Sequence, residues 1–247
     1  MTFIQTKTFT LAANTAGDEH SSKIALVLPG KLDTKDHAHM LGHIDFLSSK
    51  GFYALSFDPP GTWDSKGDIS LYTMTNYLQA INELIAVLGN RPTFLVGHSR
   101  GGSMAMLAGT ANRYVTHFAA IMSYYSFSPD VHGGYPDPEW EAQGYMLSKR
   151  TDPKDPATKR SFKLPYTFLE DQVQYDMTDA LKVSPKPKLF ILGTQDTTVD
   201  PEIVRETFQY AAEPKVLREI ASDHDYRKDQ VMIQQVNTFL EEFLQEY

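Results

Sequence analysis

The chain has 247 residues, of which 41% are hydrophobic and 22% are charged, and it contains no cysteine. These values are typical of a folded globular protein and exclude intrinsic disorder, disulfides and thiolate catalysis. The net charge of −8 argues against nucleic acid and anionic membranes as partners. The first residues lack a basic segment leading into an apolar stretch, and no window approaches 18 apolar residues, so we expect a cytoplasmic protein.

Short apolar runs alternate with longer helical patterns from about residue 24 onward, which predicts βα units and a mainly parallel sheet. Before them, Phe3–Leu11 alternates apolar and polar residues and is expected to form an antiparallel strand at a sheet edge. Buried strands are predicted at Lys23–Leu28, Tyr53–Phe57, Thr93–Val96, Phe118–Ser123, Lys188–Leu192 and Val216–Ile220. Helices are predicted at Thr75–Leu88, Gly102–Asn112, Glu202–Ala212 and Gln230–Leu244. We therefore expect one α/β domain over residues 1–247, with helices on both sheet faces.

One segment interrupts this alternation, from about Ser126 to Pro187, where the chain is rich in Pro, Gly, Asp and Lys. Long segments of this kind in compact domains are often functional, so we interpret it as a lid inserted over the carboxyl edge of the sheet. The alternative is a long surface excursion with a few helical turns. Its aromatic residues either contact a substrate or form a small core of the lid itself. They are Tyr135, Trp140, Tyr145, Phe162, Tyr166, Phe168 and Tyr175.

The sequence Gly97-His98-Ser99-Arg100-Gly101-Gly102 lies directly between a predicted strand and a predicted helix. In a strand–turn–helix of this type the serine occupies a strained turn, so small residues are needed two positions before and after it. The helix N-terminus directs unpaired N–H groups toward the serine and favours developing negative charge. Ser99 is therefore the predicted nucleophile.

A serine hydroxyl needs a base to take its proton and a carboxylate to orient that base. In enzymes with this turn, the acid lies between the serine and the histidine in the sequence. His224 lies between the last predicted strand and the last helix, where a loop can reach the sheet edge, and it is the predicted base. His117 precedes a strand and so lies at the opposite edge. His132 comes before any acid that follows a core strand.

The predicted orienting carboxylate is Asp196, which follows the strand expected at Lys188–Leu192. Asp200 precedes a proline and is better explained as the N-cap of the next helix. Asp176 and Asp179 are disfavoured because they lie before that strand.

These residues together resemble the α/β-hydrolase superfamily, and the resemblance extends across most of the chain. Gly193–Val199 matches the family's G-x-x-D-x-x-V acid loop, and Asp58–Ser65 is similar to its D-x-x-G-x-G/x-S turn. The position and size of the inserted segment resemble those of small bacterial esterases of the feruloyl or cinnamoyl type. The resemblance implies the α/β-hydrolase fold and a catalytic triad of Ser99, His224 and Asp196.

Family members usually carry His-Gly after the third strand, whereas this chain has Pro29-Gly30-Lys31. The resemblance implies that the backbone N–H groups of Lys31 and Arg100 form the oxyanion hole, with Leu32 replacing Lys31 if the loop is shifted by one residue. The side chains of Lys31 and Arg100 either recognise an acidic substrate group or form salt bridges with acids of the lid.

His37, His39 and His43 follow this loop with a spacing that places imidazoles on one helix face, which is compatible with a metal site. The same spacing arises on a solvated helix, and no carboxylate pattern completes the site. We therefore expect a solvated helix and no metal.

The sequence thus predicts a serine hydrolase that cleaves a carboxylic ester of a small molecule through an acyl-enzyme, without a cofactor. It leaves the oligomeric state open. A thioesterase, a C–C hydrolase or an aminopeptidase on the same fold is the first alternative. An aminopeptidase needs an acidic subsite, for which the candidates are Asp137, Glu139, Glu141 and Asp171. A non-catalytic binding protein is the remaining alternative, although such proteins often lose a triad residue.

Overall fold

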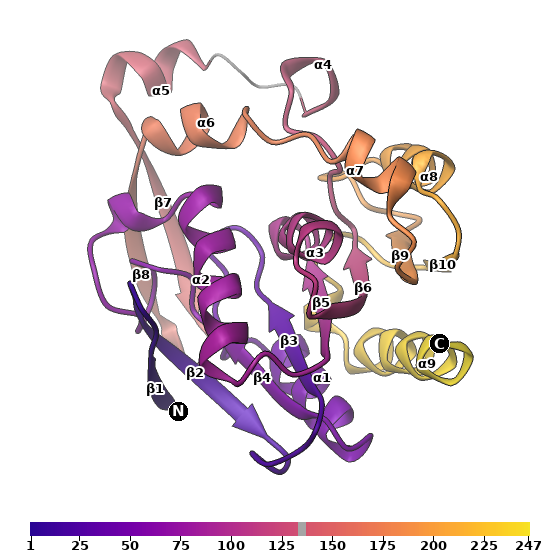
Figure 1. The fold of residues 1–247 in the computed structure, drawn as a ribbon. Helices are drawn as coiled ribbons and strands as arrows, with labels where there is room; N and C mark the ends of the chain where they lie inside the picture. The colour runs from indigo at the N-terminus through magenta and orange to yellow at the C-terminus, as the bar shows by residue number, and fades with distance from the viewer. Residues whose placement is uncertain (133–136) are drawn as a thin grey trace.

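A computed structural model describes residues 1–132 and 137–247 of the chain (Figure 1). In this described part, the main sheet has eight strands in the order β1-β2-β4-β3-β5-β6-β9-β10. The strands from β4 to β10 run parallel, whereas β1 and β2 join one edge antiparallel. The strand bounds are β1 (Thr2–Gln5), β2 (Thr10–Ala16), β3 (Ile24–Leu28), β4 (Tyr53–Phe57), β5 (Thr93–His98), β6 (Val115–Ile121), β9 (Lys188–Gly193) and β10 (Lys215–Ile220).

The central strands are buried along their whole length. Every residue of β3, β5 and β9 is buried. Parallel strands covered on both faces have no solvent side, so their sequences are continuous apolar runs instead of alternating patterns. The edge strand β1 is mostly exposed, in agreement with the expectation of an antiparallel edge.

Helices cover both faces of this sheet and enclose two apolar cores. One face is covered by α1 (Ala38–Ser49) and α9 (Gln230–Glu246), and the other by α2 (Met74–Val87), α3 (Arg100–Ala111) and α8 (Pro201–Tyr210). Helix α9 buries Ile233, Val236, Leu240 and Phe243, whose spacing of three or four residues places them on one helical face. None of the helices in the described ranges is long and apolar enough to cross a membrane.

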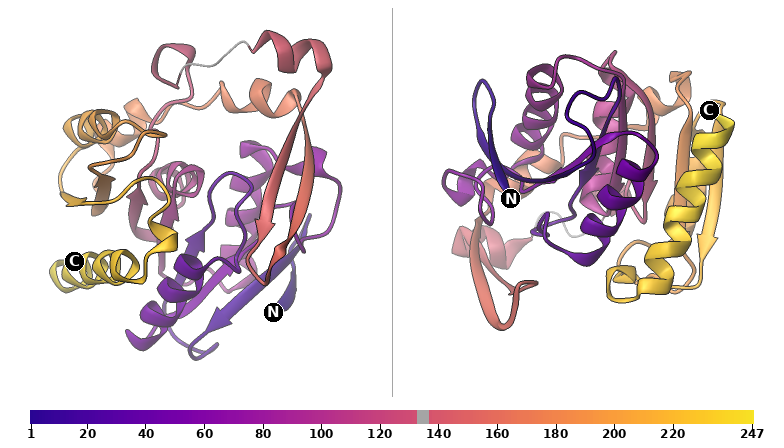
Figure 2. Two further views of the ribbon diagram at one scale, coloured as in Figure 1. Left: turned by 180° about the vertical axis from the view of Figure 1, so that it is seen from behind. Right: turned by 90° about the horizontal axis from the view of Figure 1, so that it is seen from below.

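The segment 126–187 connects β6 to β9 and forms its own small elements. They are α4 (Pro129–His132), α5 (Pro138–Gln143), β7 (Tyr145–Asp152), β8 (Asp155–Pro165), α6 (Thr167–Gln172) and α7 (Thr178–Val183). Strands β7 and β8 form a separate antiparallel hairpin beside the main sheet (Figure 2). Helices α4, α5 and α6 lie beyond the carboxyl ends of the parallel strands (Figure 1). The sequence did not predict the hairpin, because residues 155–161 of β8 are all exposed and only Phe162 and Leu164, near its end, show an apolar alternation.

A buried charged cluster holds the hairpin tip against the main domain. The side chain of Lys35 has no exposed surface and donates to Asp36 at 2.9 Å, Asp58 at 2.8 Å and Asp64 at 2.8 Å; we name these four residues the Lys35 cluster. Burial alone would lower the pKa of Lys35, but these three carboxylates raise it. Lys154, in the tight turn of the hairpin, bonds Asp36 at 2.7 Å. The cluster therefore links the loop after β3 to the inserted segment.

Two predicted strands have different bounds in the structure. The strand expected at Phe3–Leu11 is split into β1 and β2, because the Thr6 N–H and hydroxyl bond the Phe9 carbonyl and close a turn. The strand expected at Phe118–Ser123 begins at Val115 and ends at Ile121, where Met122 adopts a φ of 49° and leaves the extended region. The remaining predicted strands and helices agree within one or two residues at each end.

Candidate active site

Ser99 lies in the turn between β5 and α3, where its backbone has φ 54° and ψ −124°. A positive φ is rare for a residue with a side chain and marks a strained turn. A Cβ added at Gly97 would lie 2.0 Å from the carbonyl oxygen of Gly101, and one added at Gly101 would lie 2.0 Å from that of Leu28. The close backbone packing explains why glycine stands two positions before and after Ser99.

Two loops that are distant in sequence bring an imidazole and a carboxylate to Ser99. Asp196 lies in the loop after β9, and His224 lies between β10 and α9. Ser99 Oγ is 3.0 Å from His224 Nε2, and His224 Nδ1 is 2.7 Å from Asp196 Oδ2. The structure therefore places the three residues in one hydrogen-bond chain at the carboxyl edge of the sheet.

The Asp196 carboxylate is held in one orientation. Its side chain is only 1% exposed. Its Oδ1 accepts the backbone N–H groups of Thr198 at 2.8 Å and Val199 at 2.9 Å, which leaves Oδ2 for His224. A carboxylate fixed in this way holds the imidazole with Nδ1 protonated and Nε2 free to accept a proton.

The loop after β3 passes close to Ser99. A Cβ added at Gly30 would lie 3.3 Å from the Ser99 Cβ, so glycine lets the loop approach. Among the described residues, the N–H groups of Lys31 and Arg100 have no acceptor in the protein. The Leu32 N–H instead donates to the Tyr72 hydroxyl at 3.1 Å. Of the two oxyanion donors considered for this loop, only Lys31 has an N–H that is not already used.

The other candidates for base and acid lie elsewhere. His117 lies inside β6, near its start, and its ring stacks on Phe94. The side chain of His132 falls outside the described residues. Asp200 is the N-cap of α8 and accepts the Glu202 N–H at 3.0 Å, as the sequence predicted. Asp176 and Asp179 precede α7 or lie within it, and the former bonds Ser126 at 2.6 Å.

A cavity of about 570 Å³ opens beside Ser99 and His224. Its size is typical of a small-molecule site. Its walls combine aromatic rings with charges of both signs. The lining residues include Tyr124, Phe127 and Val199, the cations Lys31, Arg100, Arg150 and Arg227, and the carboxylates of Asp33, Asp223 and Asp225. Two of these residues were not predicted from the sequence: Phe127, near the start of the segment 126–187, and Arg150, which lies in β7 and has no neighbouring motif.

None of the acids considered for an amine subsite lines this cavity, namely Asp137, Glu139, Glu141 and Asp171. Asp171 accepts the N–H groups of Met74 at 2.7 Å and Thr75 at 3.1 Å, at the start of α2. Asp137 caps α5 by accepting the Trp140 N–H at 2.9 Å. These carboxylates hold helices in place, and the cavity has no acidic subsite made from them.

Most aromatic residues of the segment 126–187 pack against each other or the main core. Trp140 and Phe168 are buried with nearly parallel rings 6.1 Å apart, and Phe162 contacts Trp63 edge to face. Tyr135 falls outside the described residues. These rings belong to the same apolar cluster as residues of the main domain, so they do not form a separate core of the segment. Phe168 also contacts two cations of the cavity.

The expectation of a solvated histidine helix is wrong for two of its three residues. His39 and His43 have no exposed surface. His43 bonds Asn237 at 2.6 Å and the Tyr226 hydroxyl at 2.9 Å, and burial lowers its pKa to about 4. They face inward because α1 packs on the sheet and on α9.

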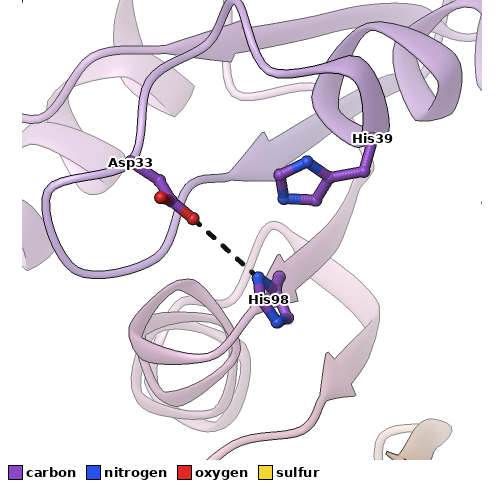
Figure 3. A group of neighbouring side chains, drawn as sticks. All are labelled: Asp33, His39 and His98. Atoms are coloured by element: carbon purple, nitrogen blue, oxygen red, sulfur yellow. Dashed lines mark ion pairs between the residues drawn. The ribbon is translucent and has the colours of Figure 1, made fainter. Parts of the chain in front are cut away.

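His39 lies instead with Asp33 and His98, and their ligand atoms are within 4.8 Å of one another (Figure 3). This donor set differs from the one considered from the sequence, and its ligand types suit a cation such as Zn²⁺. However, Asp33 already forms an ion pair with Arg227, and its other oxygen is 4.0 Å from His98 Nδ1. Because the guanidinium neutralises the carboxylate and would repel a metal ion, we interpret this group as internal packing.

A sequence model of the alpha/beta hydrolase family matches residues 34–229. The chain therefore belongs to the α/β-hydrolase family, and the fold class predicted from the sequence is confirmed. A comparison with curated proteins finds no match.

Solved structures of hydrolases share the fold along nearly the whole chain. Est1E from Butyrivibrio proteoclasticus, solved with ferulic acid bound, is 20% identical with a TM-score of 0.76, and the match covers 100% of this chain and 98% of that one. The enol-lactonase from Burkholderia xenovorans is 17% identical with a TM-score of 0.74, covering 99% and 100%. Mouse alpha/beta hydrolase domain-containing protein 10 is 17% identical with a TM-score of 0.79, covering 99% and 98%.

Proposed function

We propose that this hydrolase cleaves carboxylic esters of small molecules, with Ser99 as the nucleophile. The observation that carries the proposal is the hydrogen-bond chain from Asp196 through His224 to Ser99, which ends beside a cavity of small-molecule size. A serine on a strained turn, a base within hydrogen-bond reach and an oriented carboxylate are the parts that acyl transfer requires.

In the proposed reaction, Ser99 Oγ attacks the ester carbonyl carbon while His224 Nε2 takes the hydroxyl proton. The carbonyl oxygen becomes an oxyanion and accepts hydrogen bonds from the Lys31 and Arg100 N–H groups. Asp196 stabilises the imidazolium that forms. The C–O bond then breaks, His224 gives its proton to the leaving alcohol, and an acyl-enzyme remains on Ser99. Water, deprotonated by His224, attacks the acyl carbon. The bond between the acyl carbon and Ser99 Oγ then breaks, His224 returns the proton to Oγ, and the carboxylic acid is released.

We further propose that the segment 126–187 acts as a lid or cap over this site. Phe127 and Arg150 from this segment line the same cavity as Ser99. An inserted segment that partly encloses a cavity restricts the access of water to it. The ferulic acid bound by Est1E and the lactone chemistry named for the Burkholderia enzyme support an ester-like substrate by analogy of fold alone.

The test is hydrolysis of 4-nitrophenyl esters from acetate to laurate, comparing the wild type with Ser99→Ala. We expect wild-type turnover to be reduced by about 10⁴-fold or more in the variant, because a triad acts as a unit. Ser103→Ala is the matched control, since Ser103 lies one turn further along α3 and bonds the Tyr124 carbonyl. Equal activity of Ser99→Ala and wild type would refute the assignment of the nucleophile.

A further inference from the structure

Three cationic side chains converge on the cavity beside Ser99. Lys31 comes from the loop after β3, Arg100 from the start of α3, and Arg150 from the β7 strand of the hairpin. Arg150 donates to the Lys31 carbonyl at 3.3 Å, so the hairpin and the loop meet here. We name Lys31, Arg100 and Arg150 the cationic trio.

No described carboxylate forms an ion pair with any member of the trio. The fourth cation of the cavity, Arg227, differs because it pairs with both Asp33 and Asp225. Asp171 lies near enough to influence Arg100, but its oxygens are used at the start of α2. The salt bridges with lid acids that the sequence left open are therefore not formed.

The trio is also partly removed from water. Arg100 is 6% exposed; one of its nitrogens donates to Gln172 at 2.5 Å, while its Nε and Nη1 are buried without an acceptor. The Arg150 Nε is likewise buried and unpartnered. Buried guanidinium donors without acceptors are unfavourable, so the arrangement is better satisfied once an anion enters.

Aromatic rings pack against two of these three cations, Arg100 and Lys31. The Phe168 ring centre lies 4.4 Å from the Arg100 guanidinium carbon and 5.3 Å from Lys31 Nζ. Burial and repulsion from Arg100 and Arg150 lower the pKa of Lys31 to about 7. The ring does not neutralise the Arg100 guanidinium, so that its positive charge stays available to a ligand. A bound anion would favour the charged form of Lys31 in turn, because an opposite charge nearby raises the pKa of a lysine.

We propose that the cationic trio is a subsite for a carboxylate carried by the substrate, so that the enzyme prefers acidic esters. The guanidinium groups present paired N–H donors that match a carboxylate, and the aromatic rings accommodate the apolar body attached to it. The preference of the enzyme for acidic esters rests on the proposed ester hydrolysis at Ser99. Binding of a carboxylate to the cationic trio does not require that reaction.

The first test compares two esters of equal length, mono-4-nitrophenyl glutarate and 4-nitrophenyl valerate, which differ by a terminal carboxylate in place of a methyl group. We expect wild-type kcat/KM to favour the glutarate by about tenfold or more, as expected for charge-assisted hydrogen bonds. Arg150→Gln should reduce this ratio severalfold, and Arg150→Lys should restore part of it. Lys159→Gln removes an exposed charge from the same hairpin and should keep the ratio.

The second test measures binding of monomethyl glutarate and methyl valerate to the Ser99→Ala protein by calorimetry, with and without Arg150→Gln. Binding of the glutarate alone, weakened by Arg150→Gln, supports the subsite even if no ester is hydrolysed. Ester hydrolysis with no preference for glutarate, together with no glutarate binding, overturns the subsite and leaves the proposed function standing. Absence of both hydrolysis and binding overturns both proposals.

Discussion

Lys31 and Lys35 are four residues apart in the same loop and have opposite electrostatic surroundings. Lys35 has no exposed surface and bonds three carboxylates, which raise its pKa despite its burial. Lys31 has two arginines nearby and no carboxylate partner among the described residues, and its pKa is lowered to about 7. One loop therefore contains both a fully compensated buried cation and an uncompensated one.

Lys35 is a charge that maintains the fold, whereas Lys31 is a charge that remains available for a ligand. A buried ion pair is costly to break because the remaining charge has no partner. An uncompensated cation beside a candidate nucleophile contributes little to stability and is retained for another reason, of which binding is the most direct. Replacing each lysine separately tests whether the two charges differ in this way.

The largest effect is expected for Lys35→Met, which leaves the fully buried Asp58 carboxylate without its cation. The free energy of unfolding should fall by about 3–5 kcal/mol, the usual cost of removing one partner of a buried pair. Urea unfolding followed by circular dichroism measures this loss. A change below 1 kcal/mol would mean that the Lys35 cluster does not hold the loop.

A smaller effect is expected for Lys31→Met, which removes a half-buried charge that has no carboxylate partner among the described residues. The free energy of unfolding should stay within about 1 kcal/mol of the wild type or rise. The same urea titration applies, and the two variants serve as controls for each other because both replace lysine by methionine in one loop. A loss as large as that of Lys35→Met would remove the contrast between the two lysines.

The free energy of unfolding should also depend on pH differently for Lys31 and for Lys35. Because the folded pKa of Lys31 lies below its ordinary value of 10.5, the unfolded chain binds more protons between about pH 7 and 10.5, and stability from this group rises with pH there. The raised pKa of Lys35 gives stability that is constant below 10.5 and lost only above it. Unfolding free energies between pH 7 and 10 should therefore diverge between wild type and Lys31→Met, and keep a constant offset for Lys35→Met. Parallel curves for Lys31→Met would contradict the shift.

The smallest effect is expected for Lys154→Ala. Lys154 is about half exposed and bonds Asp36 at the edge of the Lys35 cluster. Exposed ion pairs contribute about 0–1 kcal/mol to the free energy of unfolding. The midpoint temperature of thermal unfolding should therefore change only slightly. A shift comparable to that of Lys35→Met would show that docking of the hairpin, and not the buried pairs, controls the stability of this region.

The sequence predicted the fold and the chain of Asp196, His224 and Ser99 because local patterns specify them. The turn around Ser99 requires glycines at fixed positions, and each of the other two residues follows a recognisable buried strand. Close backbone packing is visible in the sequence as glycine, and burial on both sheet faces is visible as an apolar run.

The surroundings of the site could not be predicted, since they depend on which distant elements meet. Arg150 belongs to an exposed hairpin without a motif, and only the docking of that hairpin brings it to Lys31. His39 and His43 have a spacing compatible with solvent, yet α1 turns them toward the sheet and α9. Whether a lysine has a carboxylate partner depends on the tertiary structure. The difference between Lys31 and Lys35 could therefore not be predicted from the sequence.

Labelling with a fluorophosphonate tests whether Ser99 is the activated nucleophile that we propose. The wild-type protein and Ser103→Ala should each gain the mass of one phosphonyl group, mapped by peptide mass spectrometry to Ser99, while Ser99→Ala should gain none. Folded wild-type protein that remains unlabelled, or that is labelled equally in Ser99→Ala, would contradict the account.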